Sequence, residues 1–303
     1  MKTMVAEPAG VSVGREGLLA GSVAGVGHNS GIDTEGFARD GFTVLKGVFT
    51  PDEIDRMRLD FLQQFQTEGG FAGRIKTIRS AVIPDVFNRD PRIAAFVLQP
   101  RILEALNVLI GRPVHYLHHS DIHMNWSGGW HRDSIDKPSY YDFVKTDPWA
   151  EENWADYSVY KVAVYLQDHR FNTEGFNLVP GSHRIRSTER PNEGALRSAI
   201  GDVLIFDTRL VHRGVLSHEL ESSKSFIDGV NRMSIFSSYG ADNAMSREFS
   251  EGTVWRQNMQ RQQEEYVLNP GLKAILEERG VGILPIETKP FPKSTSSLYT
   301  TMM

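Results

Sequence analysis

The sequence contains no cysteine among its 303 residues. This absence excludes disulfide bonds, thiolate zinc sites, iron–sulfur clusters and a cysteine nucleophile. Any metal ion must therefore be held by histidine, aspartate or glutamate side chains, and ten histidines are present.

Neither an excess of positive charge nor a long apolar run is present. The 33 basic residues are outnumbered by 38 acidic ones, so the formal net charge is −5. A nucleic-acid-binding surface needs a concentrated basic face, and a transmembrane helix needs roughly 20 consecutive apolar residues. We therefore expect neither a nucleic-acid partner nor a membrane span.

Residues 1–31 are rich in glycine, alanine and serine. They resemble a secretory signal peptide poorly, because Glu7 and Glu16 stand where positive charge is expected and glycines interrupt the apolar run. We expect a flexible arm over 1–31 in a cytoplasmic protein. The whole chain is 40% apolar and 23% charged, which is typical of a soluble globular protein.

Helices are predicted at the start of the folded chain, after a short strand over 41–45. Thr50 can cap a helix whose first residue is Pro51, since proline suits the first helical position. A second helical stretch runs over 91–110 and ends at Gly111, which is followed two residues later by proline.

The chain after Pro113 has the composition of β-strands separated by turn residues. The spacing is typical of a sandwich or jelly roll and not of βαβ units. The predicted strands cover 114–126, 157–167, 176–179, 203–211 and 232–239, and helices are predicted over 253–268 and 270–279. We predict one jelly-roll domain over 32–285, mainly β with helices at both ends, and a loose tail over 286–303.

The segment Trp130-His131-Arg132-Asp133 contains two candidate metal ligands. Residues two apart on an extended chain point the same way, so His131 and Asp133 can present an imidazole and a carboxylate together. With one distant histidine they would form a 2-His-1-carboxylate triad, which is diagnostic of non-haem Fe(II) oxygenases. Such a pair by itself is also common among polar loop residues.

Two later segments supply candidate partners. His212 ends the predicted strand over 203–211, where, taken in isolation, a buried core or rim histidine is the better interpretation. Arg232 and Ser234 share one face of the next strand, and a guanidinium beside a hydroxyl is suited to a carboxylate. The alternative for Arg232 is a surface salt bridge, although a buried guanidinium needs an anion.

Taken in order, these motifs resemble the phytanoyl-CoA dioxygenase-like family of Fe(II)/2-oxoglutarate-dependent oxygenases. The likeness runs from about Asp33 to Tyr239. The segments that carry it are Gly41–Val48, Ile110–Val114, His131-Arg132-Asp133, Leu178–Arg184 with its Pro-Gly-Ser-His turn, Gly201-Asp202, His212-Arg213-Gly214 and Arg232-Met233-Ser234.

The resemblance implies a double-stranded β-helix, the cupin-like jelly-roll barrel. It implies iron ligation by His131, Asp133 and His212, and binding of 2-oxoglutarate by Arg232 with help from Ser234. The expected activity is a dioxygenase that uses O2 to oxidise, most often by hydroxylation, an unactivated C–H bond of a small-molecule substrate, with release of succinate and CO2. The iron centre itself does the chemistry, and no separate acid or base is expected.

The carboxylate at position 133 bears on the type of reaction. Related halogenases have a small residue there, which leaves room for chloride on the iron. Asp133 therefore favours oxygen transfer or desaturation over halogenation.

Two other functions remain open at this point. A metal-dependent hydrolase or isomerase on a cupin-like barrel would use the same ligands for zinc or manganese, and Arg232 would then have no carboxylate to bind. A jelly-roll binding module without catalytic activity would need none of the ligands.

Other polar residues have alternative interpretations. His115, His119 and His123 would share a strand face with Asp121, either as a second metal cluster or as residues that contact substrate. Lys161, inside an apolar strand, could reach a cosubstrate carboxylate or extend to solvent.

Three segments outside the main motifs also have predicted roles. Lys76 and Arg79 could recognise an anionic substrate or lie on an exposed edge strand. The aromatic segment between Asp133 and Tyr157 is expected to form a substrate lid, and 217–229 reads as an insertion in the hairpin before Arg232.

Overall fold

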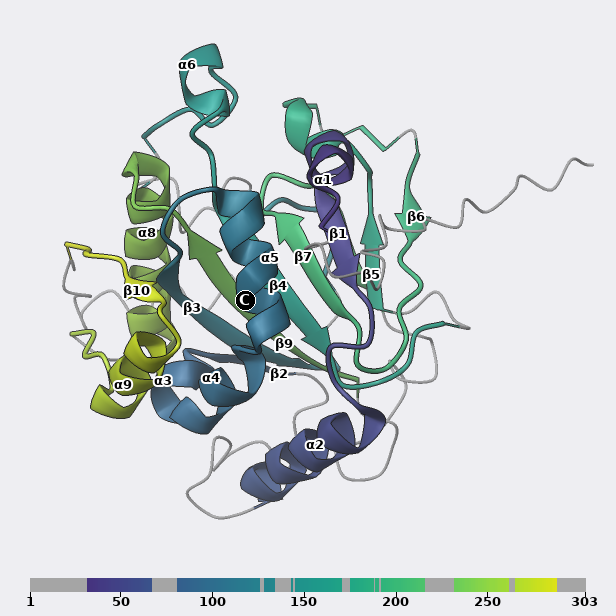
Figure 1. Ribbon diagram of the computed structural model, residues 1–303, viewed down its shortest axis with the longest axis vertical. Helices are drawn as coiled ribbons and strands as arrows, with labels where there is room; N and C mark the ends of the chain where they lie inside the picture. The colour runs from purple at the N-terminus through teal and green to yellow at the C-terminus, as the bar shows by residue number, and fades with distance from the viewer. Residues whose placement is uncertain are drawn as a thin grey trace, which may run out of the picture.

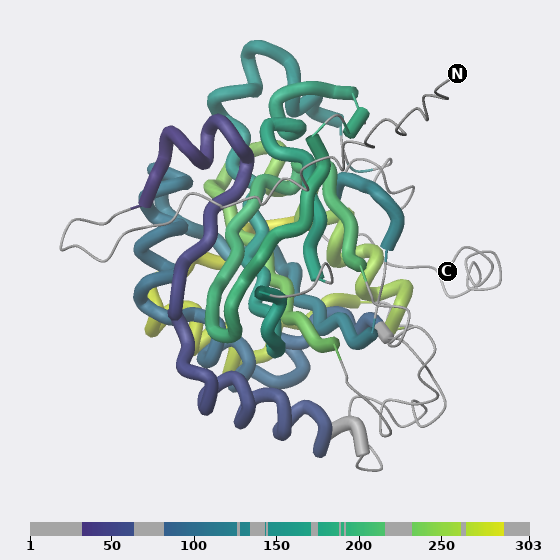
Figure 2. Tube along the Cα trace, turned by 90° about the vertical axis from the view of Figure 1, so that its right-hand side faces the viewer, coloured from purple at the N-terminus to yellow at the C-terminus, as the bar shows by residue number. Residues whose placement is uncertain are grey.

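The computed structural model describes residues 32–66, 81–125, 128–133, 143, 145–170, 175–187, 189–190, 192–215, 232–261 and 265–287. Two β-sheets lie face to face, and helices cover the outer face of the larger one (Figure 1). Turned by 90°, the molecule shows the strands of the smaller sheet in front of the larger one (Figure 2).

The larger sheet has the order β1-β7-β4-β9-β3-β10, with β2 also paired to β3. Its pairings are antiparallel except for that of β10 with β3. The strands are β1 (Phe42–Leu45), β2 (Ala81–Pro84), β3 (His115–Met124), β4 (Tyr160–Tyr165), β7 (Val203–Asp207), β9 (Met233–Gly240) and β10 (Gly282–Ile283). The smaller sheet has the order β6-β5-β8, from β5 (Gly175–Leu178), β6 (Gly194–Ala195) and β8 (His212–Val215).

Helices lie before the first strand and between later strands along the chain. They are α1 (Thr34–Asp40), α2 (Pro51–Gln66), α3 (Val86–Arg89), α4 (Pro91–Val97), α5 (Pro100–Ile110), α6 (Glu151–Trp154), α8 (Ala244–Arg261) and α9 (Pro270–Glu278), with a short 3-10 helix η3 (Ser182–Arg184). Among the described residues, no single helix is long and apolar enough to span a membrane. Taken together, α4 and α5 are long and apolar enough by length and composition alone, but the pair is bent by 74°.

Strand alternation separates two apolar layers. On β4, Val162 and Val164 pack with the helices on the outer face, in the same cluster as Ile102 of α5. Ala163 and Tyr165, the alternate residues, face the smaller sheet. The period of two along each strand therefore divides the core into a helix-facing layer and a barrel interior.

Local signals in the sequence account for the helix boundaries. Thr50 and Glu53 form a capping box, in which the backbone N–H of each residue donates to the side chain of the other. The predicted helix over 91–110 is instead two helices, because Pro100 has no backbone N–H to continue the first one and opens α5 as its first residue.

The predicted strand over 203–211 also needs correction. It ends at Asp207, and the backbone N–H of Leu210 donates to the Asp207 carbonyl at 2.9 Å to close a turn. His212 does not end this strand but begins β8, in the other sheet. The apolar character of Leu210 and Val211, both buried, continued through the turn and hid the boundary.

Several expectations concern residues outside the described ranges. These are the arm over 1–31, Lys76 and Arg79, residues 134–142 and 144 of the aromatic segment after Asp133, the insertion over 217–229 and the tail beyond residue 287. The domain limits of 32 and 285 remain a prediction.

The Gly201-Asp202 turn joins β7 to the start of the domain. The Asp202 carboxylate accepts hydrogen bonds from the Lys46 side chain at 2.9 Å and the Gly47 backbone N–H at 3.0 Å. Gly201 has a φ of +87°, and a Cβ there would lie directly on the carbonyl oxygen of Phe49. Only glycine satisfies both the dihedral angle and the close approach.

Replacement of Gly201 by alanine should therefore lower the free energy of unfolding by about 3 kcal/mol, from left-handed strain plus the clash. Gly111 is the matched control, because its φ is +66° but its Cβ would meet nothing within 4 Å. Gly111→Ala should lose only about 1 kcal/mol. Urea unfolding of the two variants measures both values, and equal losses would contradict the steric argument.

A polar cluster lies buried where β3 meets α8. His119 Nε2 is 3.3 Å from Asp121 Oδ2, and Arg256 Nη2 donates to the same oxygen at 3.1 Å. On the other side of the ring, His119 Nδ1 and Ser238 Oγ are 2.9 Å apart. Burial lowers the pKa of His119 to about 4, because Asp121 only partly offsets the desolvation, and Lys161 and Arg256 lower the pKa further.

The neutral His119 ring makes stability depend on pH. Below about pH 6.5 the His119 ring binds a proton in the unfolded chain, whereas in the folded protein it stays neutral down to about pH 4. Acid therefore favours the unfolded chain, and the free energy of unfolding falls on acidification. Relative to His119→Gln, the parent should lose roughly 1.4 kcal/mol per pH unit in this interval. Denaturant unfolding of both proteins from pH 7 to 4.5 measures the difference, and parallel curves would show that His119 does not titrate in this way.

Candidate metal centre

The candidate centre is built on a backbone pairing between two distant segments. His131 forms an isolated β-bridge with His212, in which the N–H of each residue donates to the carbonyl of the other at 2.9 and 3.0 Å. The pairing places the two imidazoles side by side, with ring centroids 4.5 Å apart.

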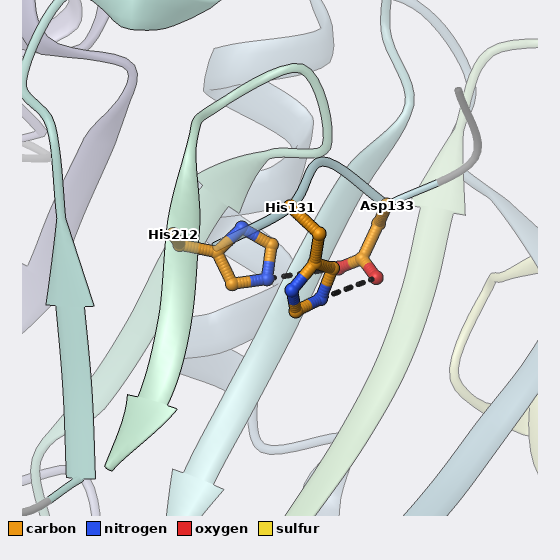
Figure 3. A group of neighbouring side chains, drawn as sticks. All are labelled: His131, Asp133 and His212. Carbon is orange, nitrogen blue, oxygen red and sulfur yellow. Dashed lines mark ion pairs between the residues drawn. The ribbon is translucent and has the colours of Figure 1, made fainter. Parts of the chain in front are cut away.

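Asp133 completes the group (Figure 3). Its backbone N–H donates to the Thr208 carbonyl at 3.0 Å, which holds the residue beside the start of β8. Asp133 Oδ1 is 3.7 Å from His131 Nε2, and Oδ2 is 3.4 Å from His212 Nε2. One ligand atom from each of the three residues lies within 4.8 Å of the others, a spacing that a single metal ion can bridge.

Each imidazole is oriented by a backbone carbonyl. His131 Nδ1 is 2.7 Å from the Gly129 oxygen, and His212 Nδ1 is 2.9 Å from the Leu210 oxygen. A carbonyl oxygen only accepts hydrogen bonds, so Nδ1 carries the proton and the Nε2 lone pair faces the other ligands. This is the tautomer that metal-ligating histidines commonly adopt.

Aromatic side chains enclose His212. The Phe176 ring stacks on the imidazole with centroids 4.9 Å apart, and the Phe206 ring meets it edge-on at 5.0 Å. His212 and Asp133 are buried, whereas the His131 side chain is 27% exposed. The group therefore has one apolar side and one side open toward solvent.

Lys161 supplies the cation beside Asp133. Its Nζ donates to Asp133 Oδ2 at 2.6 Å, and its ammonium group lies 5.9 Å from the centre of the Phe236 ring. Sequence considerations left Lys161 between a cosubstrate ligand and a residue that extends to solvent. The structure buries it against the carboxylate, where it offsets the desolvation of that charge.

Arg232 and Ser234 lie at the start of β9, on the interior face of the large sheet. Arg232 is buried, donates from Nη2 to the Gly175 carbonyl at 3.0 Å and lies over the Tyr165 ring at 5.5 Å. Ser234 Oγ is buried and has no hydrogen-bond partner among the described residues. Tyr165 is four residues from Lys161 on β4, so the β4 residue beside Arg232 and the β4 residue beside Asp133 are about 13 Å apart along the strand.

The second metal cluster considered on β3 does not form among the described residues. A β-bulge interrupts β3 between Tyr116 and Ser120, where His118 has a φ of +55°. His115 Nδ1 bonds the Pro113 carbonyl and the ring lies beside Gly282, and the bulge separates this residue from His119. Within the described ranges, His131, Asp133 and His212 are the only three groups spaced to hold an ion.

Two buried arginines near the centre had no role in the sequence interpretation. Arg132 stands between the two ligands of the first segment, and Arg209 lies three residues before His212. Arg209 forms a bidentate ion pair with Asp207 and packs on the Tyr157 ring at 3.8 Å. For Arg132, strand alternation could have indicated its position. A residue between His131 and Asp133 points away from the candidate ion and into the protein.

Comparisons with known proteins identify the family of this chain. Residues 37–215, more than half of the chain, match the family model described as phytanoyl-CoA dioxygenase (PhyH). No curated protein matches the sequence.

Solved structures resemble the fold. EctD from S. alaskensis, solved with bound Fe, is 21% identical, with a TM-score of 0.50, and the match covers 69% of this chain and 75% of that chain. ThoJ, a non-heme monooxygenase solved in the apo state, is 15% identical, with a TM-score of 0.51 and coverage of 69% and 77%. These likenesses confirm the predicted double-stranded β-helix.

The family match covers both ligand-bearing segments and the Pro-Gly-Ser-His turn between them. The enzymes of this family use iron, 2-oxoglutarate and O2, and the donor set found here suits iron. The chain therefore belongs to the phytanoyl-CoA dioxygenase family and is a non-haem iron, 2-oxoglutarate-dependent enzyme.

Proposed function

We propose that this enzyme hydroxylates an unactivated C–H bond of a small-molecule substrate, with iron held by His131, Asp133 and His212. The observation that carries the proposal is the convergence of two Nε2 lone pairs and one carboxylate within 4.8 Å. These three residues would hold the ion through half of its usual coordination positions, which would leave the others for a chelating cosubstrate and O2. Bound Fe(II) would supply O2 activation, with 2-oxoglutarate oxidised to succinate and CO2.

The protein's own groups orient and protect these ligands. The Gly129 and Leu210 carbonyls hold the protons on the two Nδ1 atoms, so neither ring can rotate without loss of a hydrogen bond. Lys161 holds one oxygen of Asp133, which leaves the other for the ion. Phe176 and Phe206 exclude water from the His212 side.

The cosubstrate is proposed to bind between the metal group and the start of β9. Arg232 supplies a planar guanidinium, and Ser234 supplies a hydroxyl that makes no hydrogen bond within the described ranges; together they match the distal carboxylate of 2-oxoglutarate. A metal-dependent hydrolase or isomerase would have no use for this buried cation at a distance from the ion. The carboxylate of Asp133 fills the ligand position in which a halogenase would need space for chloride.

Replacement of a metal ligand should abolish the iron-dependent reaction. We expect His131→Ala and Asp133→Ala to lower succinate release from 2-oxoglutarate by more than about 100-fold, because loss of a direct ligand exceeds the effect of an outer partner. The assay uses protein loaded anaerobically with Fe(II) and then exposed to O2. His115→Ala is the matched control, since this histidine bonds the Pro113 carbonyl and is not one of the three residues spaced to hold an ion.

Full activity in either ligand variant would exclude these residues as the iron site. A screen of cell extract for products 16 mass units heavier than their precursors would identify the substrate and test hydroxylation. Products two mass units lighter would instead show desaturation or ring closure.

Arg232→Ala should weaken cosubstrate binding with little effect on iron. Removal of one partner of a buried charged pair costs about 2 kcal/mol or more, so the Kd of 2-oxoglutarate should rise at least about 30-fold. Titration of the metal-to-ligand absorption band of the Fe(II)–2-oxoglutarate complex measures this Kd. Arg247→Ala, at an exposed ion pair with Asp242, is the control. An unchanged Kd would place the cosubstrate carboxylate elsewhere.

A further inference from the structure

Arg132 lies in the middle of the His131–Asp133 segment and points away from the metal group. Its side chain is 1% exposed, and it ranks among the largest fully buried side chains of the described residues. A buried guanidinium needs acceptors for its five N–H groups. Its partners therefore show what this charge is used for.

The guanidinium bonds backbone carbonyls from two other parts of the chain. Nε donates to the Arg209 oxygen at 2.9 Å. Nη1 donates to the Arg186 oxygen at 3.2 Å, and Nη2 donates to the Ile185 and Ser187 oxygens at 3.0 and 2.5 Å. The planar fork thus joins the segment that carries two ligands to the turn after η3 and to the turn before β8.

An aromatic platform orients the guanidinium. Its carbon lies 5.2 Å from the centre of the Trp149 ring, and Trp149 Nε1 donates in turn to the His183 carbonyl at 2.9 Å. Arg186 approaches the same indole at 5.7 Å, but its side chain is 65% exposed. Arg132 and Arg186 therefore both contact the Trp149 indole, but only the buried Arg132 donates to the backbone carbonyls described above.

The bond to Arg209 connects both halves of the metal centre. Arg209 precedes His212 by three residues, and the neighbouring Thr208 carbonyl accepts the Asp133 N–H at 3.0 Å. Arg132 thus ties the turn that leads into the third ligand to the segment that carries the first two. A lysine would present one point of charge instead of a planar fork and could not reach all of these oxygens.

We propose that Arg132 is a positioning residue for the metal centre. Arg132 holds the His131–Asp133 segment against the chain leading into His212 before any ion binds. It does not contact the ion. It acts through the backbone, by holding three ligand atoms at a spacing that one ion can bridge. The inference rests on the metal site assigned under the proposed function.

The test compares Arg132→Lys and Arg132→Gln with the parent and with Arg186→Lys. Metal-free proteins are titrated with Co(II) by calorimetry, and the ligand-field absorption of the Co(II) forms reports the coordination geometry. We expect both Arg132 variants to bind Co(II) about 10- to 100-fold more weakly, as for other residues that orient metal ligands. Their spectra should differ from the parent spectrum, whereas Arg186→Lys should match the parent in both respects.

A purely structural role would give a different result. Thermal unfolding of the metal-free proteins measures the loss of fold stability separately. Variants that melt at a lower temperature yet bind Co(II) with the parent's affinity and spectrum would overturn the proposal. If the parent itself binds no Co(II), the failure belongs to the metal site and not to Arg132.

Hydrogen exchange of the metal-free parent tests the proposal even if neither variant folds. A segment that is held in place without an ion should protect the backbone N–H groups of His131, Asp133 and His212, which bond the His212, Thr208 and His131 carbonyls. Exchange of these amides at the rate of an unstructured peptide, with protection only after Co(II) is added, would show that the ion and not Arg132 forms the site.

Discussion

The backbone pairing of His131 with His212 is the constraint on which the candidate site depends. Two reciprocal hydrogen bonds join a segment that follows the large sheet's β3 to the first residue of β8 in the small sheet. Because the pairing is made by the backbone, it brings the two side chains to one place whatever those side chains are. Histidine at both positions then turns a structural contact between the sheets into a pair of adjacent nitrogen atoms that could hold an ion.

Three buried carboxylates of the described residues have partners of opposite charge. Asp133 bonds Lys161, Asp207 bonds Arg209, and Asp121 bonds Arg256. A charge moved from water into the interior is unfavourable unless it is paired, so these contacts are the condition under which the barrel can hold polar groups at all. The same condition limits which substitutions the interior tolerates, since loss of one partner leaves the other charge buried.

The two ends of the barrel interior have different chemistry. One end carries the two imidazoles and the carboxylate, with Lys161 and the β3 cluster of His119 and Asp121 nearby. The other end carries Arg232 over Tyr165, where burial raises the pKa of the tyrosine hydroxyl to about 12, so that it remains protonated. A dianionic cosubstrate that chelates a cation at one end and meets a guanidinium at the other fits this separation of charge.

Residue order and local periodicity were sufficient for much of this protein. The absence of cysteine restricted the ligand types, the spacing of His131 and Asp133 set their common direction, and the turn residues indicated a jelly roll. Thr50 and Pro51 marked a helix start because capping depends on neighbours in the sequence. Partners distant in the chain were decided only by the tertiary structure. The bulge at His118 interrupted the regular alternation between His115 and His119, the turn after Asp207 moved His212 into the other sheet, and burial directed Lys161 to Asp133 and Arg132 to its carbonyls. Local spacing specifies which way a side chain points, but its partner depends on which strand packs opposite.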